Sequence, residues 1–561
     1  MAKWMLGAAA SVAALFIATL AAADKYDFVK CDGYGAPNSH GDGMTKPAMG
    51  LLGIFVPEPG RGNRSRTDVS FSADGTAACD RALVDPDLMP GYHLRRVNLI
   101  QARAMHRLGA KDPTGALSDL DLSARQGKAS GEPLYERSLG LSNQLLRAYA
   151  LGSLGRPADA VAAARRVRTL RPYAARACYA AARLAASIDH DASAYIAELR
   201  EIVRFAPEML TELLLAEYSS GHWDAVIALR PQVVLTPPSD NTGFQVERDG
   251  VAEAEIFAQA AMLDCATAFS HAAKGRPEVA TAMLAAVKTR LDEAAADLPL
   301  RPNGKQPSRG DRLRHANLTA RLAPVREAYD EALRHVGLLA IARRGDPPAL
   351  MSAIAGKPLL GDETGQEVLM ALYRANPPAK EELAKIIADR RLKLDAERFT
   401  PVKLEDLYVA LPEAETPARL PHYSLGRNWL GEKTGDGFLI RKGGTPDRFT
   451  LDFGGSAGSA AIVQELALLR VADLARQQGK TSVIVVSRNL YVRESRLLGL
   501  YGGGRVDNAG YSSEITVALV KPSQIPVDLA ASRDRLLDAE RVYLELAPVY
   551  IGSVAPVAAG S

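Results

Sequence analysis

Two distant stretches of the chain share one arrangement of small and apolar residues. They read GRPADAVAAARRVRTLRP at 155–172 and GRPEVATAMLAAVKTRLDE at 275–293. At matching offsets they carry Gly155, Ala160, Ala164 and Val167, and Gly275, Ala280, Leu284 and Val287. A small residue lets two helix axes approach closely where they cross, and a proline ends a helix. Pro172 and Pro207 stand about 35 residues apart, so the sequence predicts a repeating stack of helix pairs.

These features resemble the tetratricopeptide repeat family over about residues 90–300, with insertions at 127–136 and 301–314. The resemblance implies an all-α helical-repeat solenoid whose groove is lined by the first helix of each unit. Placed on that repeat, the residues on the inner surface are Arg96, Arg103, His106 and Tyr149. Such side chains suit a carboxylate or a peptide backbone, and an ordinary polar surface is the alternative interpretation.

Helical periodicity extends on both sides of the best repeats. In YHLRRVNLIQARAMHRLG it aligns Leu94, Val97, Gln101, Ala104, Met105 and Leu108 on one stripe. We expect tetratricopeptide-like repeats over 91–300. Further helices at 324–344, 363–375 and 379–397 are expected within 301–398, where they extend or cap the array.

The first 23 residues have the order of a signal peptide. Lys3 provides a positive charge, an apolar run follows, and the small residues Ala21–Ala23 precede Asp24. We expect cleavage near Ala23 and a periplasmic or secreted mature protein with no membrane span. The apolar run is nearly long enough to cross a bilayer, so a retained anchor and a core helix remain alternatives.

The four cysteines fall into two kinds. Cys31 and Cys79 lie within 24–90, which is rich in Gly, Pro and Ser and is predicted to be irregular. In an oxidising compartment a disulfide between them would tie this segment down. Cys178 and Cys265 lie in alanine-rich helical patterns and are expected to be buried thiols. No cysteine or histidine spacing suggests a metal site.

Near Phe399 the pattern changes from helical to strand-rich. The runs are LEDLYVALP, DGFLIRK, RFTLDF, TSVIVVSRNLYVR, SSEITVALV and ERVYLELAPVYI, with one helix expected at 458–479. YGGGRVDNAGYSS, at 501–513, is typical of a long hairpin tip. We therefore predict a smaller α+β domain at 399–561. It resembles small bacterial envelope lipoproteins of unknown function, a resemblance that implies no known chemistry.

The segment FTLDFGGSAGSAA has the outline of a dinucleotide site, because a strand, glycines and a helix follow in order. Gly454, Gly455 and Gly458 could present backbone N–H groups to a phosphate, and Arg488 could face a ribose phosphate. The segment does not match GxGxxG, however, and it stands alone. A helix stripe of Ile462, Leu466, Leu469 and Ala472 favours a structural turn.

Charge and motifs narrow the classes of function. The chain has 68 Lys and Arg against 65 Asp and Glu, so we do not expect a nucleic-acid binder. It lacks the signatures of hydrolases, zinc proteases, P-loop proteins and kinases, so we expect no enzyme and no cofactor. The sequence favours an exported bacterial envelope scaffold or adaptor that binds a protein or peptide through the helical groove. The alternative is an enzyme, or a small-ligand or nucleotide-binding protein, with its site in the C-terminal domain.

Overall fold

The computed structural model describes residues 25–37, 70–235, 251–300, 304–427, 436–445, 447–456, 458–497 and 505–552. The expected signal peptide lies outside them. The helical part contains α1 Lys25–Asp32, α2 Ala73–Val84, α3 His93–Gly109, α4 Pro113–Ala129, α5 Leu139–Ser153, α6 Pro157–Leu170, α7 Ala175–Asp189, α8 Ala192–Ile202, η2 Pro207–Met209, α9 Leu210–Tyr218, α10 Trp223–Leu229, η3 Arg230–Gln232, α11 Val251–Ala273, α12 Pro277–Ala295, α13 Arg309–Ala320, α14 Leu322–Arg343, α15 Pro347–Ile354, α16 Glu363–Ala375, η4 Pro377–Ala379, α17 Lys380–Glu397, α18 Leu404–Ala410 and η5 Pro417–Arg419.

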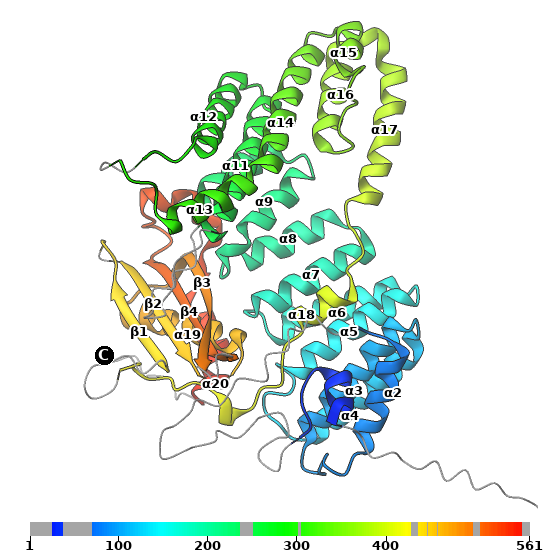
Figure 1. Cartoon of the computed structure of the whole chain (residues 1–561), viewed down its shortest axis with the longest axis vertical. Helices are drawn as coiled ribbons and strands as arrows, with labels where there is room; N and C mark the ends of the chain where they lie inside the picture. Colours follow the sequence, from blue (N-terminus) through cyan, green and yellow to red (C-terminus); the bar gives the residue numbers. More distant parts are fainter. Residues whose placement is uncertain are drawn as a thin grey trace, which may run out of the picture.

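The C-terminal part contains β1 Gly437–Lys442, β2 Arg448–Gly455, α19 Ala460–Gln477, β3 Ser482–Leu497, β4 Arg505–Val520, η6 Val527–Arg535, β5 Leu537–Asp538 and α20 Ala539–Tyr550. Figure 1 shows the helices as a long array with the sheet beside its middle. The protein is therefore mostly helical, with a small sheet region at its C-terminal end.

The two GRP stretches each form the turn and second helix of a helix pair. Gly155 and Gly275 adopt positive φ angles of 70° and 78° between consecutive helices, a conformation that favours glycine. The proline after each Gly-Arg stands in the first turn of the next helix, where it has no hydrogen bond to lose. The buried residues that follow are Ala160, Ala164, Val167, Ala280, Leu284 and Val287. The predicted contact faces are confirmed.

The N-terminal segment is more ordered than expected. Helices α1 and α2 pack on α3 and on each other, and the disulfide between Cys31 and Cys79 joins them. The prediction of an irregular segment is wrong for these two helices, which close one end of the helical core. Cys178 and Cys265 are free and buried, as expected.

The chain returns to the first helices after α17. Figure 1 shows this return as the yellow segment that leads to α18. Leu404, Leu407 and Leu411 join the buried cluster of α3–α7. The prediction of a strand at LEDLYVALP is wrong, because Leu404, Leu407 and Tyr408 recur at helical spacing and form the buried face of α18.

The C-terminal sheet has the order β1-β2-β4-β3-β5, and every neighbouring pair is antiparallel. Four predicted strands and the helix at 458–479 are confirmed as β1, β2, β3, β4 and α19. ERVYLELAPVYI instead forms α20, because Val542, Tyr543, Leu546 and Ala547 bury one helical face. β3 and β4 pair as antiparallel strands, but the prediction of a hairpin tip at 501–513 is wrong for residues 505–513, which belong to β4; residues 501–504 lie outside the described residues.

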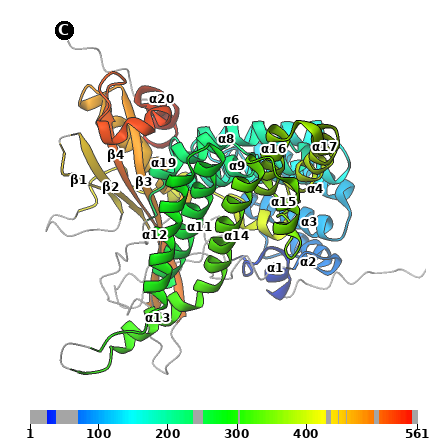
Figure 2. The same cartoon turned by 90° about the horizontal axis from the view of Figure 1, so that it is seen from above.

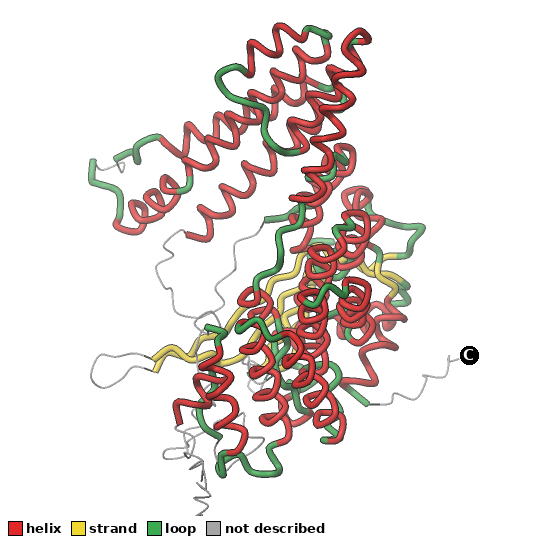
Figure 3. The backbone as a smooth tube through the Cα atoms, turned by 90° about the vertical axis from the view of Figure 1, so that its right-hand side faces the viewer, coloured by secondary structure: helices red, strands yellow, loops and turns green. Residues whose placement is uncertain are grey.

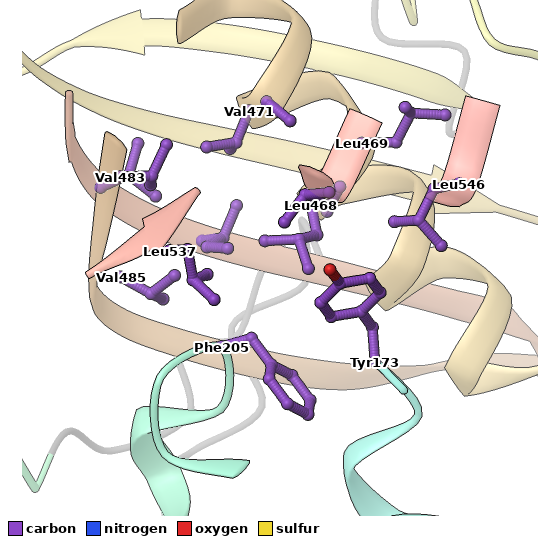
Figure 4. Close-up of a cluster of buried hydrophobic side chains, with 14 of the residues drawn as sticks. Tyr173, Phe205, Leu468, Leu469, Val471, Val483, Val485, Leu537 and Leu546 are labelled. Carbon is purple, nitrogen blue, oxygen red and sulfur yellow. The ribbon is translucent and has the colours of Figure 1, made fainter. Parts of the chain in front are cut away.

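The sheet domain shares a core with the helical body. Helix α19 and α20 pack beside the sheet, and Tyr173 and Phe205 reach the same cluster from the helical part. Figure 4 shows the Tyr173 ring beside Leu468 and Phe205 at the lower edge of the same cluster. On another part of the sheet, η6 packs Leu529 against β3 and β4. Among the described residues, no helix combines the length and apolar character needed to cross a bilayer.

Candidate binding cleft

A cleft of about 760 Å³ lies among α9, α11, α14 and the start of α16. Pockets that hold small molecules or peptide side chains commonly have volumes of about 300–1,000 Å³. Its wall residues are Thr211, Leu215, Tyr218, Glu255, Ala258, Gln259, Met262, Leu263, Cys265, Ala266, Phe269, Arg321, Pro324, Glu327, Ala328, Glu331, Ala332, His335, Leu360, Asp362 and Thr364. We call this the α9–α14 cleft. Its size and mixed lining make it the leading candidate site.

Apolar side chains form most of the inner wall. Phe269 is buried at the deep side, in the cluster that joins α11, α14 and α16. Met262 is 47% exposed and Leu215 is 44% exposed, although both are large apolar residues. Exposed apolar groups that share a concave wall mark surfaces that a ligand can cover. The wall therefore offers apolar contact area that the fold itself leaves open.

Charged residues surround this apolar wall. Arg321 pairs with Glu255 at 2.8 Å, across the space between α14 and α11. Glu331 pairs with Arg334 at 2.9 Å and with Lys357. Glu327 is exposed and has no ion pair within the described part of the chain. Glu327 is therefore available to a positively charged group on a ligand.

His335 and Cys265 are neutral groups in the inner wall. Burial, together with the neighbouring Arg334 charge, lowers the pKa of His335 to about 4. The ring Nδ1 donates to the Glu331 carbonyl at 2.9 Å, so Nε2 accepts from the Leu360 N–H at 3.4 Å. Burial raises the pKa of the Cys265 thiol to about 12. At neutral pH both side chains are uncharged, which keeps this wall suited to apolar ligands.

A second cleft, of about 730 Å³, adjoins the first. Leu215, Tyr218 and Asp362 line both clefts. The second is otherwise formed by α8, α9 and the segment around the end of α17. Asp362 accepts the backbone N–H groups of Thr364 and Gly365, so its carboxylate caps α16. The two clefts thus meet at one rigid helix start.

The arginines expected to line the groove bind within the protein instead. Arg96 donates to the backbone carbonyls of Leu83 and Leu88 at 3.0 and 3.2 Å. Arg103 pairs with Asp119 at 2.6 Å and with Asp80 at 2.7 Å. These bonds join α3 to α2 and α4 and to the loop that follows α2. The guanidinium groups already have partners inside the fold.

His106 requires a correction. Its side chain is 1% exposed, and its ring lies 2.9 Å from the carbonyl of Cys31 and accepts the N–H of Ser72. A partner on the surface cannot reach it, because α1 and α2 cover this part of α3. Tyr149 is half-buried and packs on the core that includes α18. The four predicted residues therefore do not converge on the cleft.

The glycine turn before α19 lets two segments of the chain pack closely, and the carboxylate of Glu415 lies at the start of the helix. Gly458 has a φ of 92°, and a Cβ there would lie 3.0 Å from the Arg419 carbonyl. Ser459 caps the helix and also donates its hydroxyl to Glu415. Because a carboxylate of the chain already lies at this helix start, a phosphate would meet negative charge. Arg488, the other candidate, donates to Glu208 at 3.0 Å.

A buried ionic cluster joins the helical body to the sheet domain. The side chain of Arg171 is 0% exposed and lies 3.0 Å from Glu415 and 2.9 Å from Glu465. Arg137 lies 2.9 Å from Glu465, and the Tyr550 hydroxyl donates to the same carboxylate. Burial raises the pKa of Glu465, but the two arginines outweigh it and lower the pKa to about 2. This cluster fixes how the two parts meet.

Sequence reasoning missed both the cleft and the cluster. Leu215 and Met262 carried a usable signal, since both are large apolar residues in helices whose buried faces are already complete without them. Arg171 and Glu465 carried none, because each resembles an ordinary helix-surface charge.

No group of three or more His, Cys, Asp or Glu is placed to hold a metal within the described ranges. Comparisons with family models, curated proteins and solved structures found no match.

Proposed function

We propose that the protein is an exported envelope adaptor that binds a segment of a protein partner in the α9–α14 cleft. The observation that carries the proposal is the cleft itself, whose apolar wall is open and whose rim is charged. The successive helix pairs support reading the helical part as a tetratricopeptide-like solenoid. In such arrays the concave side formed by stacked helices is the common binding surface.

The chemistry of the lining defines the partner segment. Met262 and Leu215 offer apolar contacts, which an amphipathic peptide covers with its own apolar face. The residues that line the cleft include three glutamates, Glu255, Glu327 and Glu331, and one arginine, Arg321. Glu327 has no ion-pair partner within the described residues. A segment with apolar side chains and a flanking Lys or Arg therefore fits better than an acidic one.

Export is supported by two features of the N-terminal part. Residues 1–23 have the order of a signal peptide, and the cysteines that follow, Cys31 and Cys79, lie at disulfide distance. Disulfides persist in oxidising compartments and are rare in the cytosol. The periplasm of a bacterium meets this condition, so the proposed partner is another envelope protein.

Site-specific photocrosslinking tests the proposal. A benzophenone amino acid replaces Met262 in the full chain, which is expressed in its native cells and irradiated. The matched control replaces Met351, which is 63% exposed on α15 and outside the cleft. We expect a discrete protein adduct from position 262 that is absent from position 351 and lost on Glu327→Arg. Equal adducts at both positions, or none at 262, would contradict the proposal.

The second hypothesis places a small-ligand site or an enzyme in the C-terminal domain. The described cleft that touches this domain has a volume of about 620 Å³ and lies between α6, α8 and α20. Its arginines already have partners: Arg168 with Glu198 at 2.6 Å, and Arg541 with Glu545 at 3.0 Å. This pairing favours an interface role. Copurification of a small molecule with the full chain, displaced by Arg168→Glu, would favour the second hypothesis instead.

A further inference from the structure

Helix α13 projects from the helical array, where it contacts α11, α12 and α14. Figure 2 shows it at the end of the α11–α12 pair, away from the bulk of the protein. None of its residues is buried. Its start is fixed by a capping box, in which Ser308 and Asp311 each bond the other's backbone N–H. Leu318 packs against the buried cluster of α11, α12 and α14, so packing accounts for that residue, whereas the residues that α13 presents to solvent need another reason.

This projection carries concentrated positive charge. We define the basic corner as the exposed residues Lys305, Arg309, Arg312 and Arg314. Arg314 pairs with Asp311, but Arg312 donates to a carbonyl, that of Pro307, at 2.9 Å. No acidic side chain pairs with Arg309 or Arg312 within the described part of the chain. The two guanidinium charges are therefore uncompensated at the surface.

Apolar side chains accompany these charges. Leu300 is 58% exposed and Leu313 is 43% exposed. Arginines interspersed with exposed leucines are typical of surfaces that lie on a membrane, where the charges meet headgroups and the leucines enter the boundary with the acyl chains. A nucleic-acid surface would instead show a broad basic stripe with fewer apolar groups.

The position of the β3–β4 ribbon agrees with a common docking face. Figures 2 and 3 both show this ribbon and α13 projecting to the same side of the protein. The ribbon is a two-stranded extension there, since β2 pairs with β4 only over Tyr511–Ala518. One planar surface could therefore meet both projections.

We propose that the basic corner docks the protein on an anionic membrane surface, such as the headgroups of phosphatidylglycerol. This role is independent of the α9–α14 cleft and would leave that cleft free for its partner. Each Lys or Arg near an anionic surface adds attraction, so loss of two such charges is expected to weaken partitioning by roughly thirtyfold. High salt should weaken it as well.

Vesicle cosedimentation tests the inference with the full chain purified from its native cells. The variant is Arg309→Gln/Arg312→Gln, and the matched control is Arg166→Gln/Arg176→Gln, two exposed arginines of α6 and α7. Vesicles contain either phosphatidylcholine alone or phosphatidylcholine with phosphatidylglycerol. We expect the first pair to lower partitioning to anionic vesicles by roughly thirtyfold, and the control pair to leave it near wild type.

A second variant tests the contact of the leucine with the membrane separately from the contribution of the charges. Leu313→Asp should also reduce binding to anionic vesicles, and circular dichroism should be unchanged because Leu313 is 43% exposed and is not part of the buried core. Equal partitioning of wild type and Arg309→Gln/Arg312→Gln would overturn the inference. Partitioning of the wild type that is the same on neutral and anionic vesicles would also overturn it, since attachment would then not depend on the basic corner.

Discussion

Replacing Arg171 by methionine should strongly destabilise the contact between the helical body and the sheet domain. Methionine keeps much of the length of the side chain but removes the charge that lies 3.0 Å from Glu415 and 2.9 Å from Glu465. Both carboxylates are buried. Removing one partner of a buried ionic group typically costs about 3–5 kcal/mol, because the remaining charge is left without compensation.

The carboxylate most affected is Glu415. Glu465 keeps Arg137 and the Tyr550 hydroxyl, whereas Glu415 keeps, among the described residues, only the Ser459 hydroxyl. In the variant, Glu415 can avoid a bare buried charge by binding a proton. At pH 7 that proton costs about 4 kcal/mol, since each pH unit above an ordinary pKa of about 4.3 costs about 1.4 kcal/mol. The destabilisation should therefore shrink by about 1.4 kcal/mol for each unit of pH below 7.

Urea unfolding followed by circular dichroism at pH 7, 6 and 5 measures this effect. Arg176→Met is the control, because Arg176 is exposed on α7 and should change the free energy of unfolding by no more than about 0.5 kcal/mol. Arg171→Met/Glu415→Met should recover much of the lost stability, since it removes the stranded carboxylate. A loss below about 1 kcal/mol at pH 7, or a loss independent of pH, would refute the reasoning.

Three further predictions concern the helical part. Ala164→Trp should lower the free energy of unfolding by about 1–3 kcal/mol, because Ala164 is buried at a helix contact, whereas Ala162→Trp on the exposed face should not; equal melting temperatures would contradict the contact. Burial lowers the pKa of His335 from 6.5 to about 4. The stability that the neutral ring contributes to the folded state is therefore complete above pH 6.5 and is lost as pH falls toward 4. Urea unfolding of His335→Gln should accordingly depend less on pH across that window, and an unchanged dependence would argue against it. Removing the Cys31–Cys79 disulfide should cost about 2–5 kcal/mol, measured by thermal melting with and without reductant, and no shift would show that the bridge is not formed.

Local sequence patterns predicted the fold where the apolar residues followed one clear periodicity, either helical or alternating. Ala160 and Val167 identified a helix contact face, and alternating apolar residues identified β2. LEDLYVALP failed because Leu, Tyr and Val suit both a strand and a helix. The spacing of Leu404, Leu407 and Leu411 by three and four residues was the deciding signal. ERVYLELAPVYI failed for the same reason, and tertiary burial of one helical face decided its state.

The site could be predicted only as a type of surface. A groove formed by stacked helices followed from the repeated stretches, but its location depended on which helices were covered. The repeat predicts Arg96 and His106 on the inner surface of the array, and the segment before them is predicted to be irregular. Helices α1 and α2 instead cover that surface. Long-range pairs such as Arg171 with Glu465 leave no local pattern, since nothing in either neighbourhood identifies its partner.

The return of the chain to α18 has a consequence for the order of folding. The core of the first helices stays incomplete until Leu404, Leu407 and Tyr408 have been synthesised, because these residues fill it. Tyr408 also donates to the carbonyl of Asp32 at 3.2 Å, a contact between nearly opposite ends of the helical part. Such contacts of high sequence separation form late and slow folding. A ribosome-bound chain that ends before α18 would thus expose apolar surface, to which a holdase chaperone could bind until α18 is synthesised.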